Sequence, residues 1–296
     1  MHEQVELRNE HPYRHVLQAS QRVAWRIEDV LPDDARFDVT RPMLPVALSG
    51  VDAVDALDAS TRLALDHVRA SSYLRLFGLV EEFILPFVLD HVRDRLGADD
   101  DEIRALLQFA GEEAKHIQLF DRFADRFARD VGVTCDVIGP ASEIADAVLA
   151  HDALGVALVI LHVEWMTQRH YVESVQGETR LEPLFASLLR QHWLEEAQHA
   201  RLDAMIVDTL AARLSPSDVR RGIDDYRRIC AVLEDGLCAQ VELDLVSLER
   251  MTGRELSRDV RTQLRDAQRA SYRTTFLESG ATHPAFRRSL DALSKR

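Results

Sequence analysis

The segment QHWLEEAQH, residues 191–199, contains the pattern Glu-Glu-Ala-x-His, and GEEAKH, residues 111–116, contains the same pattern. In both copies a glutamate lies three residues before the histidine, so the two side chains share one face of an α-helix. A carboxylate beside an imidazole is a good metal-ligand pair and a poor pair for an apolar core. The repeated pattern therefore predicts two helices that each bind metal through the second glutamate and the histidine.

Two lone glutamates complete the pattern. Glu81 precedes Glu113 by 32 residues, and Glu164 precedes Glu196 by the same 32 residues. Adding 83 to each residue number of the first set gives the second set. Four helices that each contribute one inward glutamate, two of them with a histidine three residues later, form the ligand plan of the ferritin-like di-iron or di-manganese carboxylate proteins.

The periodicity of the apolar residues predicts an all-α protein. Together with the resemblance of the ligand plan to the ferritin-like proteins, it implies a ferritin-like four-helix bundle with a long crossover and additional N- and C-terminal helices. No segment has a persuasive strand pattern. The predicted bundle helices are 60–96, 101–130, 152–175 and 181–214, with the crossover at 131–140. The predicted additional helices are 12–30, 142–151, 217–252, 256–278 and 283–294.

At 296 residues the chain is long enough to form one large domain with additions. Residues 1–59 are expected to be an N-terminal helix and strap that pack on the bundle, residues 60–214 the bundle, and residues 215–296 a helical extension of the same domain. Within the first region, residues 31–50 are rich in proline, which excludes a long helix there. Residues 41–45 within this loop are expected to be an extended strap across the bundle or a plain linker.

Composition and charge limit the partners and the location. The formal net charge of −14 argues against a general nucleic-acid binder, because no excess of basic side chains neutralises phosphates. The longest apolar runs, such as residues 153–163, are too short to span a membrane. No signal peptide is visible in residues 1–6, and Cys135, Cys230 and Cys238 form no CxxC pair. We therefore expect a cytoplasmic protein that is not bound to a membrane and has no structural disulfides.

The first bundle helix carries two adjacent glutamates, Glu81 and Glu82. When this helix is projected at about 100° per residue, Glu81 lies near the centre of the apolar face. Glu82 falls about 100° away, close to Arg75 and Arg93. The projection and the repeat spacing both favour Glu81 as the ligand, and Glu82 is the alternative.

His192 adds a further candidate ligand to the second set. It lies four residues before Glu196 and seven before His199, on the same helix face, and the matching position in the first set is Phe109. His192 is predicted to be a seventh ligand, and the alternative is an ordinary histidine that donates to a neighbouring carboxylate. Asp203, four residues after His199, is expected either to orient that imidazole or to be a surface charge.

The paired Glu-x-x-His motifs with lone glutamates resemble those of the ferritin-like di-iron oxidase and oxygenase superfamily, over roughly residues 60–214. With His192 added, the motif set is similar to that of the para-aminobenzoate N-oxygenase family of arylamine oxygenases. This resemblance implies a di-iron centre with four glutamate and three histidine ligands and no catalytic residues beyond them: Glu81, Glu113, His116, Glu164, His192, Glu196 and His199. It also implies an enzyme that activates O2 at reduced iron and oxidises the amine nitrogen of a small substrate.

Other members of the superfamily remain alternatives. An acyl desaturase carries two similar motifs but lacks an expected counterpart of His192, and an oxidase with a mixed Mn/Fe centre could use the same ligands. In a ribonucleotide reductase small subunit a radical tyrosine is expected one turn after the first motif, where this chain has Phe120. The alternative from another class is a ferritin-like metal-binding protein without turnover.

The resemblance leaves the surroundings of the centre to be predicted. Leu85, Phe109, Phe120 and Tyr171 are expected to form a mostly dry pocket beside it. Electrons must come from a redox partner protein or a small reductant, because no flavin, haem or iron–sulfur motif is visible. A homodimer through the exposed faces of the C-terminal helices is one option. His162 and His170 project away from the lone glutamate of their helix and are expected to be structural.

Overall fold

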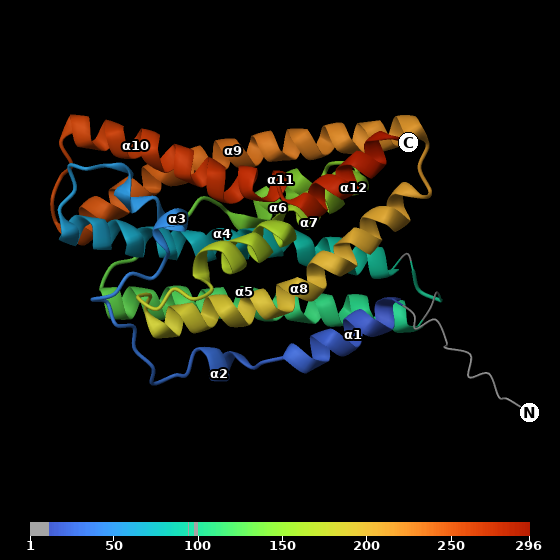
Figure 1. The fold of residues 1–296 in the computed structure, drawn as a ribbon, viewed down its shortest axis with the longest axis horizontal. Helices are drawn as coiled ribbons and strands as arrows, with labels where there is room; N and C mark the ends of the chain where they lie inside the picture. Colours follow the sequence, from blue (N-terminus) through green and yellow to red (C-terminus); the bar gives the residue numbers. More distant parts are fainter. Residues whose placement is uncertain (1–11, 94, 98–99) are drawn as a thin grey trace, which may run out of the picture.

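The computed structural model describes residues 12–93, 95–97 and 100–296, and this part of the chain contains helices and no strand (Figure 1). Two helical hairpins form the bundle: α4 (Ala59–Arg93) packs against α5 (Asp100–Val131), and α7 (Ala153–His170) packs against α8 (Pro183–Ala211). The predicted all-α, ferritin-like four-helix bundle is confirmed. The expectation that residues 1–6 hold no signal peptide lies outside the described residues.

Local sequence explains where the bundle helices begin. Three acidic residues occupy the first turn of α5, where carboxylates interact favourably with the helix dipole. At the start of α8, the Glu182 side chain accepts a hydrogen bond of 2.6 Å from the Phe185 amide. Pro183 follows at the first helical position, where its missing N–H costs nothing.

The segment between the two hairpins runs from the end of α5 to the start of α7. The chain leaves α5, passes through residues 132–140, and forms the short helix α6 (Ala141–Leu149), which packs against α4. The Asp152 side chain then accepts a hydrogen bond from the Leu154 amide at the start of α7. The predicted crossover and short helix are therefore present in the expected order.

The C-terminal helices pack on the bundle along its length (Figure 1). Helix α9 (Pro216–Thr252) contacts α4 and α7, and α10 (Arg258–Arg273) returns along α9. The crossing of α7 and α9 is close because of two glycines: a Cβ on Gly155 would lie only 3.0 Å from the carbonyl oxygen of Gly222. Two more helices, α11 (Ser279–Ala281) and α12 (Pro284–Ser294), also pack against α7. The division of the chain into three regions stays a prediction.

The N-terminal helix differs from its prediction. The predicted helix 12–30 is wrong as a single element, because the structure has α1 (Pro12–Val23), a break, and α2 (Ile27–Val30). In the break, the Trp25 indole N–H donates to the carbonyl of Gln191 at 3.0 Å, and its ring stacks on His116 with a centroid distance of 5.7 Å. These contacts with α8 and α5 hold the chain in a non-helical conformation that the apolar periodicity does not reveal.

The proline-rich segment crosses the bundle as a strap with two short helices, α3 (Val46–Ser49) and a 3-10 turn at Val51–Ala53. The buried carboxylate of Asp66 on α4 holds it, because Asp66 accepts hydrogen bonds from the amides of Met43 at 2.6 Å and Leu44 at 3.2 Å. Of the two interpretations of this segment, the strap is the one that the structure shows.

Two predicted helices end in π-helical turns, at Tyr171–Val175 after α7 and at Thr274–Glu278 after α10. The predicted ranges 152–175 and 256–278 include these turns, so the prediction erred only in the type of helix. His170 joins both regions, since its Nε2 lies 2.9 Å from the carbonyl oxygen of Thr275.

The apolar core consists of two clusters at the two ends of the bundle. One contains residues of α4 up to Phe77 and residues of α5 from Leu119 onward. The other contains residues of α4 from Phe83 onward and residues of α5 up to Ala110. The helices α7 and α8 also change from one cluster to the other at mid-length. The predicted metal ligands lie in the layer between the two clusters.

Candidate metal centre

All seven predicted ligands are buried in this layer, with at most 4% of any of them exposed. Two overlapping groups offer ligand atoms that all lie within 4.8 Å of one another: Glu81, His116, His192 and Glu196, and Glu113, His116, Glu196 and His199. His116 and Glu196 belong to both groups. Such overlap is the arrangement expected of two adjacent metal ions that share ligands.

The imidazoles of the two motifs both turn Nδ1 toward the shared glutamate. His116 Nδ1 lies 3.1 Å from Glu196 Oε1, and His199 Nδ1 lies 3.3 Å from the same oxygen. His199 Nδ1 is also 2.8 Å from Glu113 Oε1, and His116 Nδ1 is 3.6 Å from Glu81 Oε1. Each imidazole therefore faces at least two carboxylates.

His192, which lies one helical turn before Glu196 on α8, also faces the shared glutamate. Its Nε2 lies 3.3 Å from Glu81 Oε1 and 3.2 Å from Glu196 Oε1. This geometry suits both interpretations of the residue, a seventh ligand and a donor to a neighbouring carboxylate. Of the two glutamates at the start of this group, Glu81 is buried in the cluster, whereas Glu82 is exposed and lines a surface cavity.

Glu164 on α7 lies beside the cluster and belongs to neither four-residue group. Burial raises the pKa of Glu164 well above its usual value, and the negative charge of the neighbouring Glu196 raises it further. Its Oε2 has no hydrogen-bond partner. The structure therefore brings this glutamate next to the shared carboxylate, with one oxygen free for a ligand bond.

Two functional residues were missed by the sequence reasoning: Glu112 and Glu195, the first glutamates of the two motifs. His116 Nε2 donates to Glu195 at 2.8 Å, and His199 Nε2 donates to Glu112 at 2.9 Å. Each motif thus supplies the carboxylate that holds the histidine of the other motif. A hydrogen bond of this kind fixes the orientation and the tautomer of a ligand imidazole. The repeated Glu-Glu doublet was the available signal.

The two outer carboxylates have different partners of their own. Lys115 Nζ donates to Glu195 at 2.5 Å and lies 3.8 Å from the centroid of the Trp25 ring. Glu112 accepts hydrogen bonds from Ser20 and, at 2.8 Å, from Gln108. A cation therefore supports one outer carboxylate, and neutral donors support the other.

The buried charges of the cluster are not balanced by the protein alone. Both oxygens of Glu113, Oε2 of Glu81, Oε1 of Glu196 and the Nδ1 atoms of both motif histidines have no hydrogen-bond partner. Burial raises the pKa of Glu81 to about 8. Burial alone would lower the pKa of His116, but the hydrogen bond with Glu195 and the negative charges of Glu196 and Glu81 outweigh it and raise that pKa to about 10. Unpartnered carboxylates and imidazoles gathered in an apolar layer fit two divalent cations.

Asp203 differs from both expectations. It is 1% exposed, so it is not a surface charge. It does not orient His199 either, because Glu112 accepts the Nε2–H of that imidazole. The expectation was wrong because a helix projection places Asp203 on the correct face but cannot show which carboxylate another helix brings closer.

The predicted structural histidines of α7 are confirmed as such. His162 Nδ1 lies 2.9 Å from the hydroxyl of Tyr226, and His170 Nδ1 lies 2.8 Å from the hydroxyl of Tyr73. Burial lowers the pKa of each of these histidines to about 4. They face hydroxyl and carbonyl groups rather than carboxylates and therefore remain neutral.

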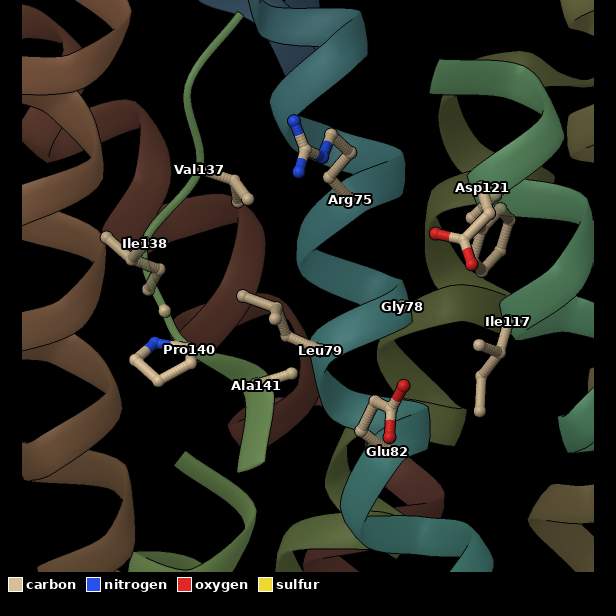
Figure 2. Close-up of a pocket in the computed structure, with 12 residues that line it drawn as sticks. Arg75, Gly78, Leu79, Glu82, Ile117, Asp121, Val137, Ile138, Pro140 and Ala141 are labelled. Carbon is tan, nitrogen blue, oxygen red and sulfur yellow. The ribbon is translucent and has the colours of Figure 1, made fainter. Parts of the chain in front are cut away.

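A cavity of about 410 Å³ opens beside the cluster, between α4, α5 and the segment that leads into α6 (Figure 2). Figure 2 shows Gly78 at its centre, with Arg75 and Glu82 on α4 and Asp121 on α5 around it. Phe120 also lines this cavity, and its ring centroid is 5.2 Å from that of His192. One aromatic side chain therefore separates the cavity from the predicted ligands.

A second cavity of about 350 Å³ adjoins the first and is almost entirely apolar. It lies between α4, α6, α7 and α9 and shares Leu79 and Ile138 with the first cavity. Phe77 lines it and also contacts His192, with ring centroids 5.4 Å apart. Both cavities therefore end at aromatic rings that pack on the same histidine.

The expected dry pocket is only partly as predicted. Phe120 lines the first cavity, but Phe109 packs directly on the His199 ring at a centroid distance of 4.2 Å. Tyr171 stacks on Trp193, also at 4.2 Å. This contact joins Tyr171 to a residue of α8, and the periodicity of one helix does not reveal it.

Among the described residues, no helix is both long enough and apolar enough to cross a membrane.

Comparison with known proteins adds a family and a fold. The family of the p-aminobenzoate N-oxygenase AurF matches residues 8–222. Among solved structures, a mutant R2-like ligand-binding oxidase with an Fe/Fe cofactor has a TM-score of 0.52 at 14% sequence identity, covering 93% of this chain and 94% of that one. Another mutant R2-like ligand-binding oxidase, with an Mn/Fe cofactor, has a TM-score of 0.52 at 15% identity with the same coverage. No curated protein matches the chain.

The family match covers more than half of the chain and includes every residue of the buried cluster. The solved structures, at their low identity, support the ferritin-like fold alone. The resemblance expected from the motifs is therefore confirmed. This chain belongs to the p-aminobenzoate N-oxygenase AurF family and is an O2-activating oxidoreductase that acts with a dimetal centre.

Proposed function

We propose that the chain is a di-iron oxygenase that oxidises the nitrogen of a small amine. The observation that carries the proposal is the pair of overlapping ligand groups joined by His116 and Glu196. The family is named for p-aminobenzoate N-oxygenase activity, which supports an amine as substrate. The proposed ligands are the seven residues predicted from the sequence: Glu81, Glu113, His116, Glu164, His192, Glu196 and His199.

When two iron ions are bound, they supply the activation of O2 and the oxidising chemistry. The side chains of the protein supply position and charge. Glu112 and Glu195 hold the two motif imidazoles with Nδ1 facing inward, so these ligands need no reorientation when metal binds. The inner carboxylates balance the charge of the metal ions. The R2-like oxidases named above include both Fe/Fe and Mn/Fe forms, and a mixed centre here would use the same ligands.

Aromatic rings keep bulk water away from the ligands. Phe77 and Phe120 pack on His192, and Phe109 packs on His199. All three phenylalanines are at most 3% exposed. A site closed in this way protects an oxidant from side reactions with solvent.

The proposed route for the substrate is the cavity around Gly78 (Figure 2). Its mouth carries Arg75, Glu82 and Asp121, so it can hold a molecule with both an amine and an acidic group. Because residue 78 has no side chain, the cavity reaches down to Phe120, and a Cβ there would lie 3.7 Å from that ring. Arg75 also donates to the carbonyl of Cys135 at 2.9 Å, which holds its guanidinium in place.

The test is metal content followed by turnover. The full chain, loaded anaerobically with Fe(II), should bind two irons per chain. On addition of O2, a chemical reductant and a panel of aryl and alkyl amines, it should yield a hydroxylamine or nitro product. Two irons with O2 consumption but a carbon–carbon double bond as product would instead indicate a desaturase. Many irons per chain without turnover would indicate a storage protein.

The electron donor and the assembly state belong to the same proposal. Electrons come from a redox partner protein or a small reductant, and the chain is proposed to form a homodimer through its C-terminal helices. Sedimentation of the purified protein gives the assembly state, and the rate of iron reduction with candidate donors identifies the partner.

A further inference from the structure

Asp203 is the ionisable residue of the cluster layer that the seven proposed ligands leave unexplained. Its side chain is 1% exposed, and neither carboxylate oxygen has a hydrogen-bond partner. An unpartnered buried carboxylate is costly, because the protein provides neither a donor nor a counter-charge to replace the lost water. A residue in this position requires either a proton or a cation.

The surroundings of Asp203 are other members of the cluster. It interacts electrostatically with His199, Glu113 and Glu196, and Glu164 in turn senses its charge. Three of these four neighbours are carboxylates, so they repel a negative charge on Asp203 rather than stabilise it. The one cationic candidate, His199, has its Nε2 bonded to Glu112 and its Nδ1 turned toward Glu113.

The two ends of the cluster differ at this point. His192 lies at the end of Glu81, where its ring packs on Phe120. Asp203 is the counterpart of Phe120 in the 83-residue repeat. It lies on α8, one turn beyond His199, at the end of the cluster that contains Glu164. One end of the cluster therefore has an additional imidazole, and the other end has an additional carboxylate.

We propose that Asp203 is a direct oxygen ligand of the metal ion held by Glu164 and His199, an inference that rests on the dimetal centre of the proposed function. The two metal positions then have unlike donor sets. The ion near Glu81 has two imidazoles, His116 and His192, and the ion near Glu164 has one imidazole and more carboxylate. Carboxylate-rich positions suit Mn²⁺, and imidazole suits Fe²⁺.

The test compares Asp203→Asn with Asp208→Asn, an exposed aspartate on the same helix. The full-length proteins are freed of metal and titrated anaerobically with Fe(II), and the irons bound per chain are counted. Asp203→Asn should bind one iron as the wild type does and should weaken the second by at least about tenfold. Asp208→Asn should bind two irons with wild-type affinity.

Asparagine resembles a protonated aspartate in size and lack of charge, which makes the outcome decisive. If Asp203→Asn binds two irons with wild-type affinity, Asp203 is a buried neutral acid and the inference is overturned, while the proposed function stands. If the wild type binds no metal, both fail. Should the variant not fold, a crystal structure of the iron-loaded wild type replaces it: an Asp203 oxygen bonded to metal supports the inference, and an intervening water or side chain overturns it.

Discussion

The two halves of the metal centre, one on α4 and α5 and the other on α7 and α8, are related by the 83-residue repeat. They share the same histidine–glutamate hydrogen bond but differ in the residues around it. In both, the histidine turns Nδ1 inward and gives Nε2–H to a glutamate of the opposite motif. Around that frame the residues differ. The first half has Lys115, Phe109 and Phe120, and the corresponding residues of the second half are Gln198, His192 and Asp203. Under the proposed ligand assignment, the repeat sets where the metals bind, and the residues that differ between the halves set the chemistry at each position.

The largest expected effect comes from Glu196, the carboxylate that both ligand groups share. Glu196 Oε1 lies within 3.3 Å of three imidazole nitrogens, and His192 and His199 lower the pKa of Glu196 well below its usual value despite its burial. Glu196→Ala should abolish binding of both irons, measured as metal content after anaerobic loading. Glu113→Ala should do the same. Glu82→Ala, on the neighbouring surface, should retain two irons; retention of two irons by Glu196→Ala would refute the ligand assignment.

The next prediction concerns a substitution that makes the second half of the centre resemble the first. His192→Phe places at this position the residue that its counterpart, Phe109, provides. The iron near Glu81 should then bind at least about tenfold more weakly, because an imidazole is lost, while the other iron keeps its affinity. Stepwise Fe(II) titration separates the two sites. Unchanged affinity at both sites would show that His192 is only a hydrogen-bond donor to Glu81 and Glu196.

A third prediction compares the two outer carboxylates. Glu195→Gln and Glu112→Gln should each weaken metal binding by about 10- to 100-fold, because each removes the charge that orients an imidazole. The effect of Glu195→Gln should be the larger, since it also leaves Lys115 without its carboxylate partner. Equal losses in the two variants would mean that the support of the outer carboxylates does not distinguish the halves.

The smallest effect concerns a histidine outside both halves. Burial lowers the pKa of His170 from 6.5 to about 4, whereas carboxylates raise that of His116. Between pH 6.5 and 4, His170 binds a proton in the unfolded chain but not in the folded one. The contribution of His170 to the free energy of unfolding is therefore present above pH 6.5 and is lost as the pH falls toward 4. The loss amounts to roughly 3 kcal/mol.

Urea unfolding from pH 8 to pH 4.5 measures this effect. His170→Gln should reduce the slope of stability against pH, at some cost at pH 8 from the lost hydrogen bond with Tyr73. An unchanged slope in His170→Gln would show that the residue is not the neutral group its surroundings indicate.

Much of the buried cluster could be predicted from the sequence because its residues follow helical spacing. Glu113 and His116 are three residues apart, and an inward glutamate on each helix follows from the apolar face. What could not be predicted depends on contacts between helices. The bond from His116 to Glu195 joins α5 to α8, and no spacing within one helix reveals it. The break at Trp25 has the same origin, because its partners lie on α5 and α8.

The exchange of outer glutamates between α5 and α8 has a consequence for how the protein comes together. Neither hairpin alone supplies the hydrogen-bond acceptor for its own motif histidine. The hairpin of α4 and α5 alone would leave His116 without Glu195, and that of α7 and α8 alone would leave His199 without Glu112. Two identical hairpins related by a twofold axis would each supply the glutamate that accepts from the other's histidine. The single chain therefore has the internal organisation of a symmetric pair. Both groups of possible ligand atoms also include residues of both hairpins, so neither group is complete until the two hairpins have docked.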